Sequence, residues 1–281
     1  MLGQFLLGQF VLSQIGGPDW WVYLLTFLVG VGAGVLSALL GVGGAVVTTP
    51  AIRVLGATPI LAVGSTVPAI LPAAISGTWR YAKAGLVDWR AALGLGISGA
   101  VFAVGGAMTS SLIDGRILML LTAFLMFWSG ISVVRGGRGS GQPEPDTEPD
   151  TEPHTEPKHS LPVIGSLGAA SGFVAGLLGV GGGIIMVPVL TGPLKIPMKS
   201  AVASSLVAVA IFSIPALVTH IILGHVDWAF ALPLMLGVIP GAQIGARITI
   251  GSSDRSIRLL FGALIIVLAL VYGISEALAF F

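Results

Sequence analysis

The chain has 281 residues, of which 55% are hydrophobic and only 9% are charged, and its formal net charge is +1. Soluble globular domains carry charges at roughly a quarter of their positions, so this composition excludes an ordinary soluble protein. The absence of cysteine also excludes disulfides, thiolate catalysis and cysteine-based metal sites.

Residues 1–19 form an apolar lead-in that contains no Lys or Arg and ends in Gly16-Gly17-Pro18-Asp19. A secretory signal begins with a positively charged region, which this segment lacks. The segment can instead lie at the membrane interface, ahead of the first crossing.

Residues 20–135 are predicted to form the first of two transmembrane repeats. Their apolar runs are long enough to cross a hydrocarbon core of roughly 30 Å as helices. The run from Trp20 to about Leu55 is too long for one crossing and is interrupted at Gly41-Val42-Gly43-Gly44. We therefore expect a helix, a break and a half-helix, followed by spans at about 60–80, 91–111 and 116–134.

Residues 136–160 are predicted to form a disordered, acidic, Pro-rich linker. They repeat a Glu-Pro-Asp-Thr unit, contain no large apolar residue and include six of the twelve acidic residues of the chain: Glu144, Asp146, Glu148, Asp150, Glu152 and Glu156. Proline and mutually repelling carboxylates favour an extended chain over a folded one. His154 and His159 lie in this linker without an ordered carboxylate cage, so we predict no metal site.

Residues 161–281 are predicted to form a second repeat with the plan of the first. The sequence GLLGVGGGIIMVP at 176–188 repeats ALLGVGGAVVTTP at 38–50. Spans are expected at about 162–180, 200–223, 229–248 and 257–280, with a post-glycine segment to about Leu190. Duplicated, glycine-broken apolar segments are typical of transporters. We predict an all-α polytopic membrane protein with about eight transmembrane helices in two homologous four-helix repeats, with glycine-broken helices near the midplane.

The charges and the number of crossings favour different orientations of the repeats. In the first repeat most Lys and Arg residues flank the second and fourth connections, whereas in the second repeat they flank the other connections. Because positive charges gather on the cytoplasmic side, this pattern favours inverted repeats. An even number of crossings per repeat and a polar linker favour parallel repeats, unless the segments after the glycine breaks add partial crossings.

The glycine breaks are candidates for a substrate site. A broken helix leaves backbone groups without helical partners, and in lipid such groups persist where protein or a water-filled cavity satisfies them. Half-helices that begin after the breaks would direct free N–H groups at a small anion. The alternative is a kink or a close helix crossing. The candidate residues are Gly41, Gly43, Gly44, Gly179, Gly181, Gly182 and Gly183.

Hydroxyl side chains occupy matching positions in both repeats. Ser65 and Thr66 of the first repeat correspond to Ser204 and Ser205 of the second. These hydroxyls can replace the water around a sulfo or carboxylate oxygen, but serine in a membrane helix often bonds its own helix or a neighbour. Two further hydroxyls follow the first break and belong to the same class of candidates, Thr48 and Thr49.

The ionisable residues near the ends of spans have ordinary explanations as well as functional ones. Asp88-Trp89 and Asp227-Trp228 are expected to be helix N-caps with an interfacial tryptophan. His220 and His225 are candidates for proton coupling, because histidine titrates near neutrality, although interfacial histidines are common. No nucleophile-base pair and no P-loop is present, so we predict neither an enzyme nor a cofactor.

These motifs resemble the TauE/SafE family of sulfite exporters and related permeases. The resemblance covers roughly residues 22–135 and 162–278 and is carried by the glycine-proline motif and the small-hydroxyl motif of each half. The first half departs slightly, with Ala45 where the second has Gly183, and the acidic linker is not part of the pattern. The resemblance implies a multi-pass plasma-membrane carrier that exports sulfite, sulfoacetate or another small sulfur-containing or organic anion.

We therefore predict a secondary transporter that works by alternating access at a site between the two repeats. An anion-selective channel and an uptake permease for another small anion are alternatives, and a membrane enzyme or assembly factor is a more distant one. The expected partners are a small anionic substrate and the lipid bilayer, with no nucleic acid. Association into a homo-oligomer is compatible with the sequence.

Overall fold

A computed structural model describes residues 20–55, 57–110, 113, 115–136, 161–178 and 182–278. The expected lead-in at 1–19 and the linker after Gly136 lie outside these described residues. The described part of the chain contains ten α-helices and no β-strand.

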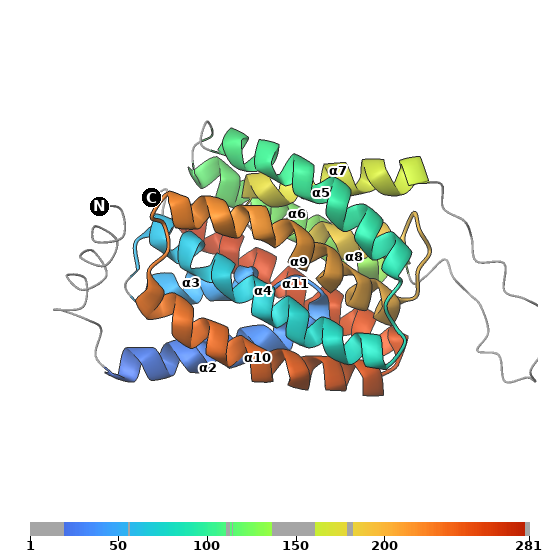
Figure 1. The fold of residues 1–281 in the computed structure, drawn as a ribbon, viewed down its shortest axis with the longest axis horizontal. Coiled ribbons are helices and arrows are strands. Elements are labelled where there is room, and N and C mark those ends of the chain that lie inside the picture. Colours follow the sequence, from blue (N-terminus) through green and yellow to red (C-terminus); the bar gives the residue numbers. More distant parts are fainter. Residues whose placement is uncertain are drawn as a thin grey trace, which may run out of the picture.

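Of the ten described helices, five lie before residue 137 and five after residue 160 (Figure 1). The first five are α2 (Trp20–Leu40), α3 (Ala45–Val54), α4 (Pro59–Lys83), α5 (Trp89–Ser110) and α6 (Gly115–Gly136). The second five are α7 (Leu161–Leu178), α8 (Gly183–Thr191), α9 (Met198–Ile222), α10 (Trp228–Gly251) and α11 (Asp254–Leu278).

Several of these helices have the length and composition of membrane spans. Five segments qualify on both criteria, namely Trp20–Leu40, Leu61–Lys83, Trp89–Gly106, Met198–Ile222 and Trp228–Gly251. A helix of 21 residues is roughly 31 Å long, which matches the hydrocarbon core. The prediction of an all-helical chain with several apolar helices of spanning length is confirmed for the described residues.

Small residues hold α2 directly against α10, which lies beside it along the lower edge of Figure 1. Gly30 packs on the backbone of Leu234 and Gly237, and Gly34, one turn later, packs on the backbone of Val238. Because residue numbers rise together along the contact, the two helices run parallel. Their backbones approach this closely because a glycine has no side chain to separate them.

The pair of α5 and α7 repeats this arrangement along the opposite edge of the bundle (Figure 1). Gly172 packs on the backbone of Gly99, and Gly176 packs one turn later on the backbone of Ala103. These helices are also parallel, and each pair joins one helix from the first half to one from the second.

Corresponding helices of the two halves point in opposite directions. In α4 and α9, Gly64 contacts His225 just beyond the end of α9, whereas Gly77 contacts Leu206 near its beginning, so the two helices are antiparallel. Since α4 runs parallel to α2 and α10, and α9 parallel to α5 and α7, the second half is inverted relative to the first.

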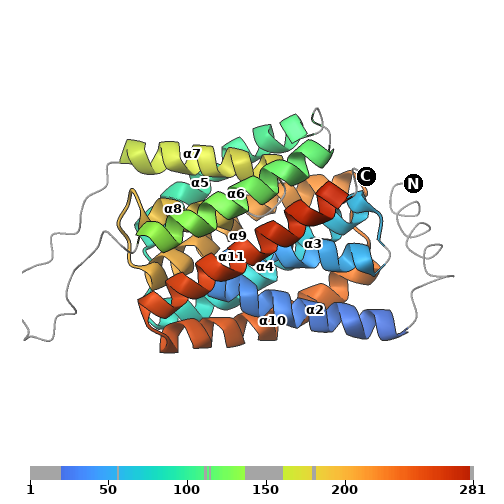
Figure 2. The ribbon, with the colours of Figure 1, turned by 180° about the vertical axis from the view of Figure 1, so that it is seen from behind.

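The short helices α3 and α8 make this inversion compatible with the chain path. The hydroxyls of Thr49 in α3 and Thr66 in α4 lie 3.3 Å apart, although only a short connection separates the two helices, so α3 runs back along α4. The α2–α3 pair therefore begins and ends at the same end of the bundle, as the two views in Figures 1 and 2 agree. Each half then carries three helices between the ends, an odd number.

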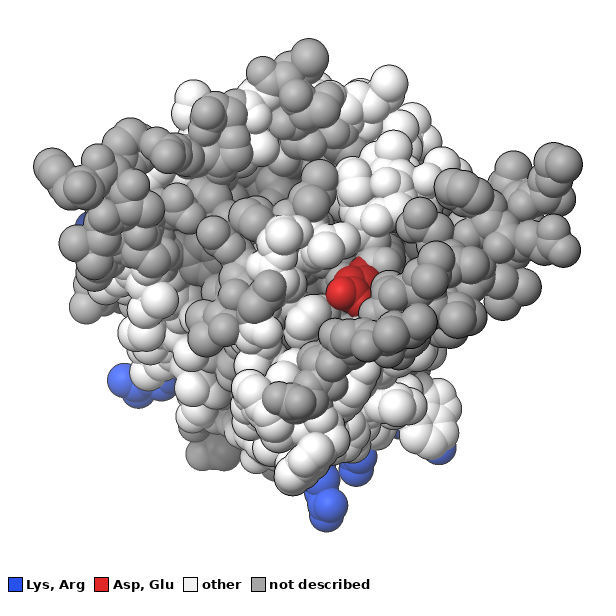
Figure 3. Space-filling view, turned by 90° about the vertical axis from the view of Figure 1, so that its left-hand side faces the viewer, with Lys and Arg blue, Asp and Glu red and all other residues white. Residues whose placement is uncertain are grey.

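Inversion brings the positive charges of both halves to one end. We call this the basic end; it comprises the C-terminal ends of α4, α6 and α10, the N-terminal ends of α5, α9 and α11, and the loop between α8 and α9. Its Lys and Arg residues are Arg80, Lys83, Arg90, Arg135, Lys195, Lys199, Arg247, Arg255 and Arg258. Arg53 and Arg116 occupy helix positions at the other end, which we call the neutral end. Figure 3 shows the neutral end; among the described residues that it colours, Lys and Arg appear only at the outline.

Candidate functional site

The two glycine breaks are built from backbone conformations that other residues rarely adopt. Gly41 follows α2 with a φ of 69°, and Gly182 precedes α8 with a φ of 66°. Such positive φ angles cost glycine little but strain residues that carry a Cβ atom. The sequence therefore ends α2 and starts α8 at glycine for a local conformational reason. The break residues Gly41, Gly43, Gly44, Gly182 and Gly183 are all buried.

The breaks of the two halves touch each other. The Gly183 backbone lies against the carbonyl oxygen of Gly41 and the Cα atom of Val42, so closely that a Cβ atom at Gly183 would overlap both. α3 and α8 both begin at this junction and run away from it toward opposite ends of the bundle. The partial positive charge of both helix N-termini therefore faces the junction.

Serine hydroxyls from neighbouring helices satisfy carbonyl groups at the junction. Ser205 of α9 donates a hydrogen bond to the carbonyl oxygen of Gly41 at 2.9 Å, and Ser129 of α6 donates to that of Ile184 at 2.5 Å. Backbone acceptors at a break require such partners away from water. Ser205 Oγ also lies 2.9 Å from the Val202 carbonyl oxygen of its own helix, so its one hydroxyl hydrogen is shared between the two carbonyls.

Two other glycines predicted for the second break, Gly179 and Gly181, are in the undescribed gap between α7 and α8.

In the first break, Gly44 packs against Ala33 and Ser37 of α2. Ser37 was missed by the sequence analysis, although it is a hydroxyl one turn before the break in an otherwise apolar helix. Its Oγ is buried and has no hydrogen-bond partner.

The predicted threonines bond mainly to the helices that carry them. Thr48 Oγ1 donates to the carbonyl of Gly44 at 3.3 Å. Thr66 Oγ1 donates to that of Val63 at 2.8 Å, so it accepts from Thr49 in their 3.3 Å contact. All three hydroxyls are buried and already have protein partners.

Ser65 and Ser204 make the same contact at opposite ends of the bundle. Ser65 Oγ accepts a hydrogen bond from the backbone N–H of Asp227 at 2.8 Å, and Ser204 Oγ accepts one from the backbone N–H of Asp88 at 2.9 Å. Each bond joins a helix of one half to a loop of the other half. We call these two contacts the neutral latch and the basic latch, after the ends at which they lie.

The aspartates at the two latches are helix N-caps, as the sequence predicted. The carboxylate of Asp227 accepts from the N–H of Ala229 at 2.9 Å, and that of Asp88 accepts from the N–H of Ala91 at 3.0 Å. These bonds satisfy N–H groups that a helix start leaves free. The latches are therefore tied to the beginnings of α10 and α5.

The structure separates two of the hydroxyl pairs that the sequence analysis grouped in one site. Gly77 of α4 contacts Leu206, so the level of Ser204 and Ser205 on α9 is near Gly77. Ser65 lies twelve residues earlier in α4, a distance of about 18 Å along a helix. A small anion cannot contact Ser65 and Ser204 at once in this conformation, whereas Ser205, Gly41 and Gly183 are together at the junction.

The two candidate histidines lie beside the neutral latch. The ring centroids of His220 and His225 are 5.6 Å apart in an edge-to-face arrangement. The backbone N–H of His225 donates to the carbonyl of His220 at 3.0 Å, and His225 is two residues from Asp227. The Nδ1 atom of His220 is buried and has no hydrogen-bond partner.

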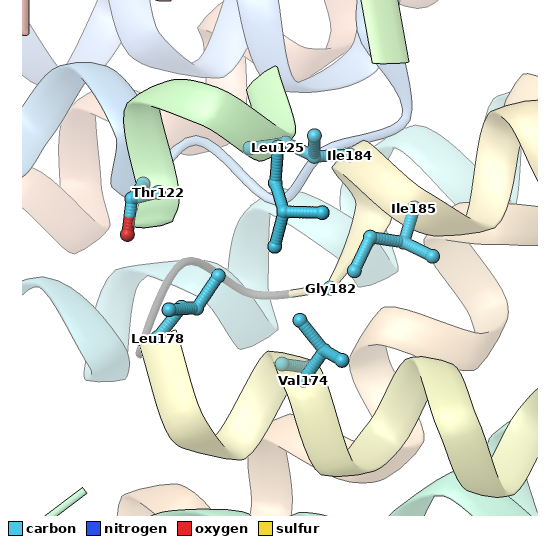
Figure 4. A pocket seen from close by; sticks show the side chains of 8 residues that line it. Thr122, Leu125, Val174, Leu178, Gly182, Ile184 and Ile185 are labelled. Carbon is cyan, nitrogen blue, oxygen red and sulfur yellow. The ribbon is translucent and has the colours of Figure 1, made fainter. Parts of the chain in front are cut away.

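A small apolar cavity borders the junction. It has a volume of about 10 Å³ and is lined by Thr122, Leu125, Val174, Ala175, Leu178, Gly182, Ile184 and Ile185. Figure 4 shows aliphatic side chains from α6, α7 and α8 converging on it. A cavity of this size holds at most about one water molecule. It is too small for an oxyanion in this conformation.

Comparison with known proteins points to a membrane transporter family. The family model described as "Sulfite exporter TauE/SafE" matches residues 26–272. A probable membrane transporter protein of Xylella fastidiosa is 30% identical over 236 residues, covering 83% of this chain and 87% of the relative.

More distant relatives carry the same general description. The probable membrane transporter protein YunE of Bacillus subtilis is 27% identical over 88% of this chain and 95% of its own length. The probable membrane transporter protein MJ0441 of Methanocaldococcus jannaschii is 26% identical over 88% of this chain and 93% of its own. No solved structure matches the chain.

Proposed function

We propose a specific activity from one premise: the chain belongs to the TauE/SafE sulfite exporter family and is a membrane transporter. The proposed activity is secondary export of a small anion across the plasma membrane, with sulfite or an organosulfonate as the substrate. The protein acts by moving the anion, not by catalysing a reaction.

The contact between Gly183 and Gly41 is the observation that carries this proposal. It joins two broken helices from oppositely oriented halves, and secondary transporters bind substrates at such points. Two helix N-termini face the junction, and their N–H groups and dipoles favour an anion without a lysine or arginine beside it. The carbonyl of Gly41 at the end of α2 has the opposite polarity and is engaged by the hydroxyl of Ser205. We propose that the anion binds here, next to Ser205.

The proposed mechanism is alternating access controlled by the two latches. Both latches are closed in this conformation, and the cavity at the junction is too small for the substrate. Opening the basic latch would admit the anion from one side, and opening the neutral latch would release it on the other. Keeping one latch closed at every stage separates a carrier from a channel.

The packing of the helices indicates which parts move. The buried cluster of Val22, Ile52, Ala69, Phe230 and Leu234 unites α2, α3, α4 and α10. A second cluster takes most of its residues from α5, α7, α8 and α9 and also includes Ala45 of α3 and Ile70 of α4. A third cluster lies across the contact between these two groups and joins α2 and α4 to α8 and α9. Because each of the first two clusters takes helices from both halves, we propose that these two mixed bundles rock against each other, with α4 and α9 at their interface.

The basic end is proposed to face the cytoplasm, because Lys and Arg gather on that side of membrane proteins. Eight helices, all except the short α3 and α8, are proposed to lie within the membrane. Six of them, α4, α5, α6, α9, α10 and α11, cross it, whereas α2 and α7 enter it and the chain returns through α3 and α8, so each half crosses three times and not four as the sequence predicted. The protein is then a multi-pass plasma-membrane protein whose linker is cytoplasmic.

Proton coupling is proposed for His220 and His225. Their rings contact each other beside the neutral latch, and Asp227 is the acidic residue of that latch. Protonation would place positive charge where the latch must open. The coupling ion and the latch motion are therefore linked in this proposal.

Flux through purified protein in proteoliposomes tests the proposed function. Vesicles loaded with radiolabelled sulfite, thiosulfate or a panel of sulfonates should show saturable efflux and counterflow for one of these anions. An anion-selective channel would instead conduct without counterflow, and an uptake permease would favour transport toward the basic end. Absence of flux with every sulfur-containing anion would overturn the substrate assignment.

A further inference from the structure

The outer surface between α4 and α10 has a hollow at the basic end. It is lined by Trp79, Arg80, Lys83, Ala84, Gln243 and Ile250, and we call it the basic hollow. We propose that the basic hollow binds the phosphate group of an anionic phospholipid. This inference rests on the membrane location proposed above.

Two cationic side chains in the hollow have only uncharged partners. Arg80 Nη1 donates a hydrogen bond to Gln243 Oε1 at 3.1 Å, and Lys83 Nζ lies 3.8 Å from the centroid of the Trp79 ring. Among the described side chains neither cation contacts a carboxylate. A guanidinium has five N–H donors and an ammonium has three, so both retain donors for phosphate oxygens.

A hydrogen-bond network fixes the two walls of the hollow relative to each other. Ser76 Oγ in α4 donates to the carbonyl of Ile239 in α10 at 3.0 Å. Gln243 Nε2 donates to the carbonyl of Ser76 at 2.7 Å, and the same amide accepts from Arg80. The hollow is thus organised before a ligand arrives, which lowers the entropic cost of binding.

The surface beside the hollow changes from apolar to charged along both helices. On α4, Ile75, Trp79 and Lys83 follow one another at four-residue spacing and so share one face; on α10, Ile239 precedes Gln243 by the same spacing. Ile75 is 57% exposed and Ile239 is 42% exposed. An acyl chain can lie on the isoleucines while its phosphate reaches the cations, and tryptophan favours this interfacial depth.

The position of the hollow favours a lipid over the transported anion. The residues that line the hollow come from α4, from the turn after α4 and from α10. The proposed substrate site lies instead in the interior, at Gly41, Gly183 and Ser205. Lys199 adds a third cation nearby, because its Nζ donates to the carbonyl of Ile250 at 3.2 Å. Basic pockets between helices on the cytoplasmic side bind lipid headgroups in this way.

Native mass spectrometry of the purified full chain tests the proposal. Protein in neutral detergent would be titrated with phosphatidylglycerol or phosphatidylcholine of equal chain length. We expect preferential binding of phosphatidylglycerol, and a loss of roughly tenfold in its affinity for the double variant Arg80→Gln with Lys83→Gln. The matched control is Arg255→Gln with Arg258→Gln, which removes the same charge from the basic end outside the hollow and should keep the preference.

Three results would overturn the proposal: equal binding of both lipids, equal losses in the variant and its control, or competition by inorganic phosphate as effective as that by the lipid. The last result would identify a site for free oxyanions. The charge-conserving variant Arg80→Lys with Lys83→Arg should retain binding, which separates a lost site from a misfolded protein. Sulfite efflux from vesicles of phosphatidylcholine alone tests the transport function separately.

Discussion

The backbone of Gly183 lies against the carbonyl oxygen of Gly41, so the first turn of α8 and the end of α2 share one contact. This contact leaves no space for a side chain at Gly183, and Ser205 and Val202 of α9 leave none at Gly41. It also joins the two places at which the halves of the chain interrupt their helices.

Replacing Gly183 by Ala should therefore disturb the junction. The added Cβ atom overlaps backbone atoms, which cannot move aside as a flexible side chain can, and we expect a stability loss of about 1–3 kcal/mol together with reduced flux. The measurements are the thermal midpoint of the detergent-solubilised protein and counterflow in proteoliposomes. Gly32→Ala is the control, because a Cβ atom at this position of α2 meets nothing within 4 Å. Unchanged flux in the Gly183 variant would count against a site at the junction.

Removing a latch hydroxyl should open the bundle at one end. Ser65→Ala removes the acceptor of the Asp227 N–H, and Ser204→Ala removes the acceptor of the Asp88 N–H. Each change should destabilise the closed form by about 1–3 kcal/mol. The chain contains no cysteine, so one introduced cysteine reports on its own position. Ala62→Cys and Ala201→Cys place this probe at buried, corresponding positions of α4 and α9.

The two variants should differ in which probe becomes reactive toward a soluble maleimide. We expect Ser65→Ala to expose the probe at position 62 and Ser204→Ala to expose the probe at position 201. If both variants exposed both probes equally, the latches would be general stabilising contacts, and independent gates would be excluded.

Substitution of the histidines tests proton coupling. If His220 and His225 exchange a proton during transport, wild-type efflux should depend on pH, and His220→Asn and His225→Asn should each remove this dependence. Initial rates at several pH values, with and without a proton gradient, provide the measurement. A wild-type rate that ignores the gradient would remove these residues from the mechanism.

The charge distribution predicts the orientation in the membrane. Gly192 lies exposed at the basic end, after α8, and Leu223 lies exposed at the neutral end, after α9. A membrane-impermeant thiol reagent applied to intact cells should label Leu223→Cys but not Gly192→Cys until the cells are permeabilised. The reverse pattern would show that the basic end faces outward.

The sequence predicted the long helices well because their boundaries depend on local composition. Spans expected at 60–80 and 91–111 are observed as α4 and α5, whose first and last residues differ from the expected ones by at most three positions. Charged or glycine residues end each apolar run, and no distant contact is needed to locate such an end.

The arrangement of the site could not be predicted in the same way. Inversion depends on α3 turning back along α4, which is fixed by contacts between helices such as that of Thr49 with Thr66. Once the halves are inverted, matching residues lie on opposite sides of the centre. Ser65 and Ser204 are therefore far apart. Only residues near the centre, such as Gly41 and Gly183, contact residues of the corresponding break in the other half.

The pairing of α2 with α10 also affects how the protein is made. α2 is the first described helix to leave the ribosome and α10 the last but one, so the glycine face of α2 has no lasting partner during most of synthesis. The same holds for α5 until α7 arrives across the linker. Membrane insertion must therefore precede final packing, and a chain halted after α6 would present two unfilled glycine faces to lipid or to quality-control proteases.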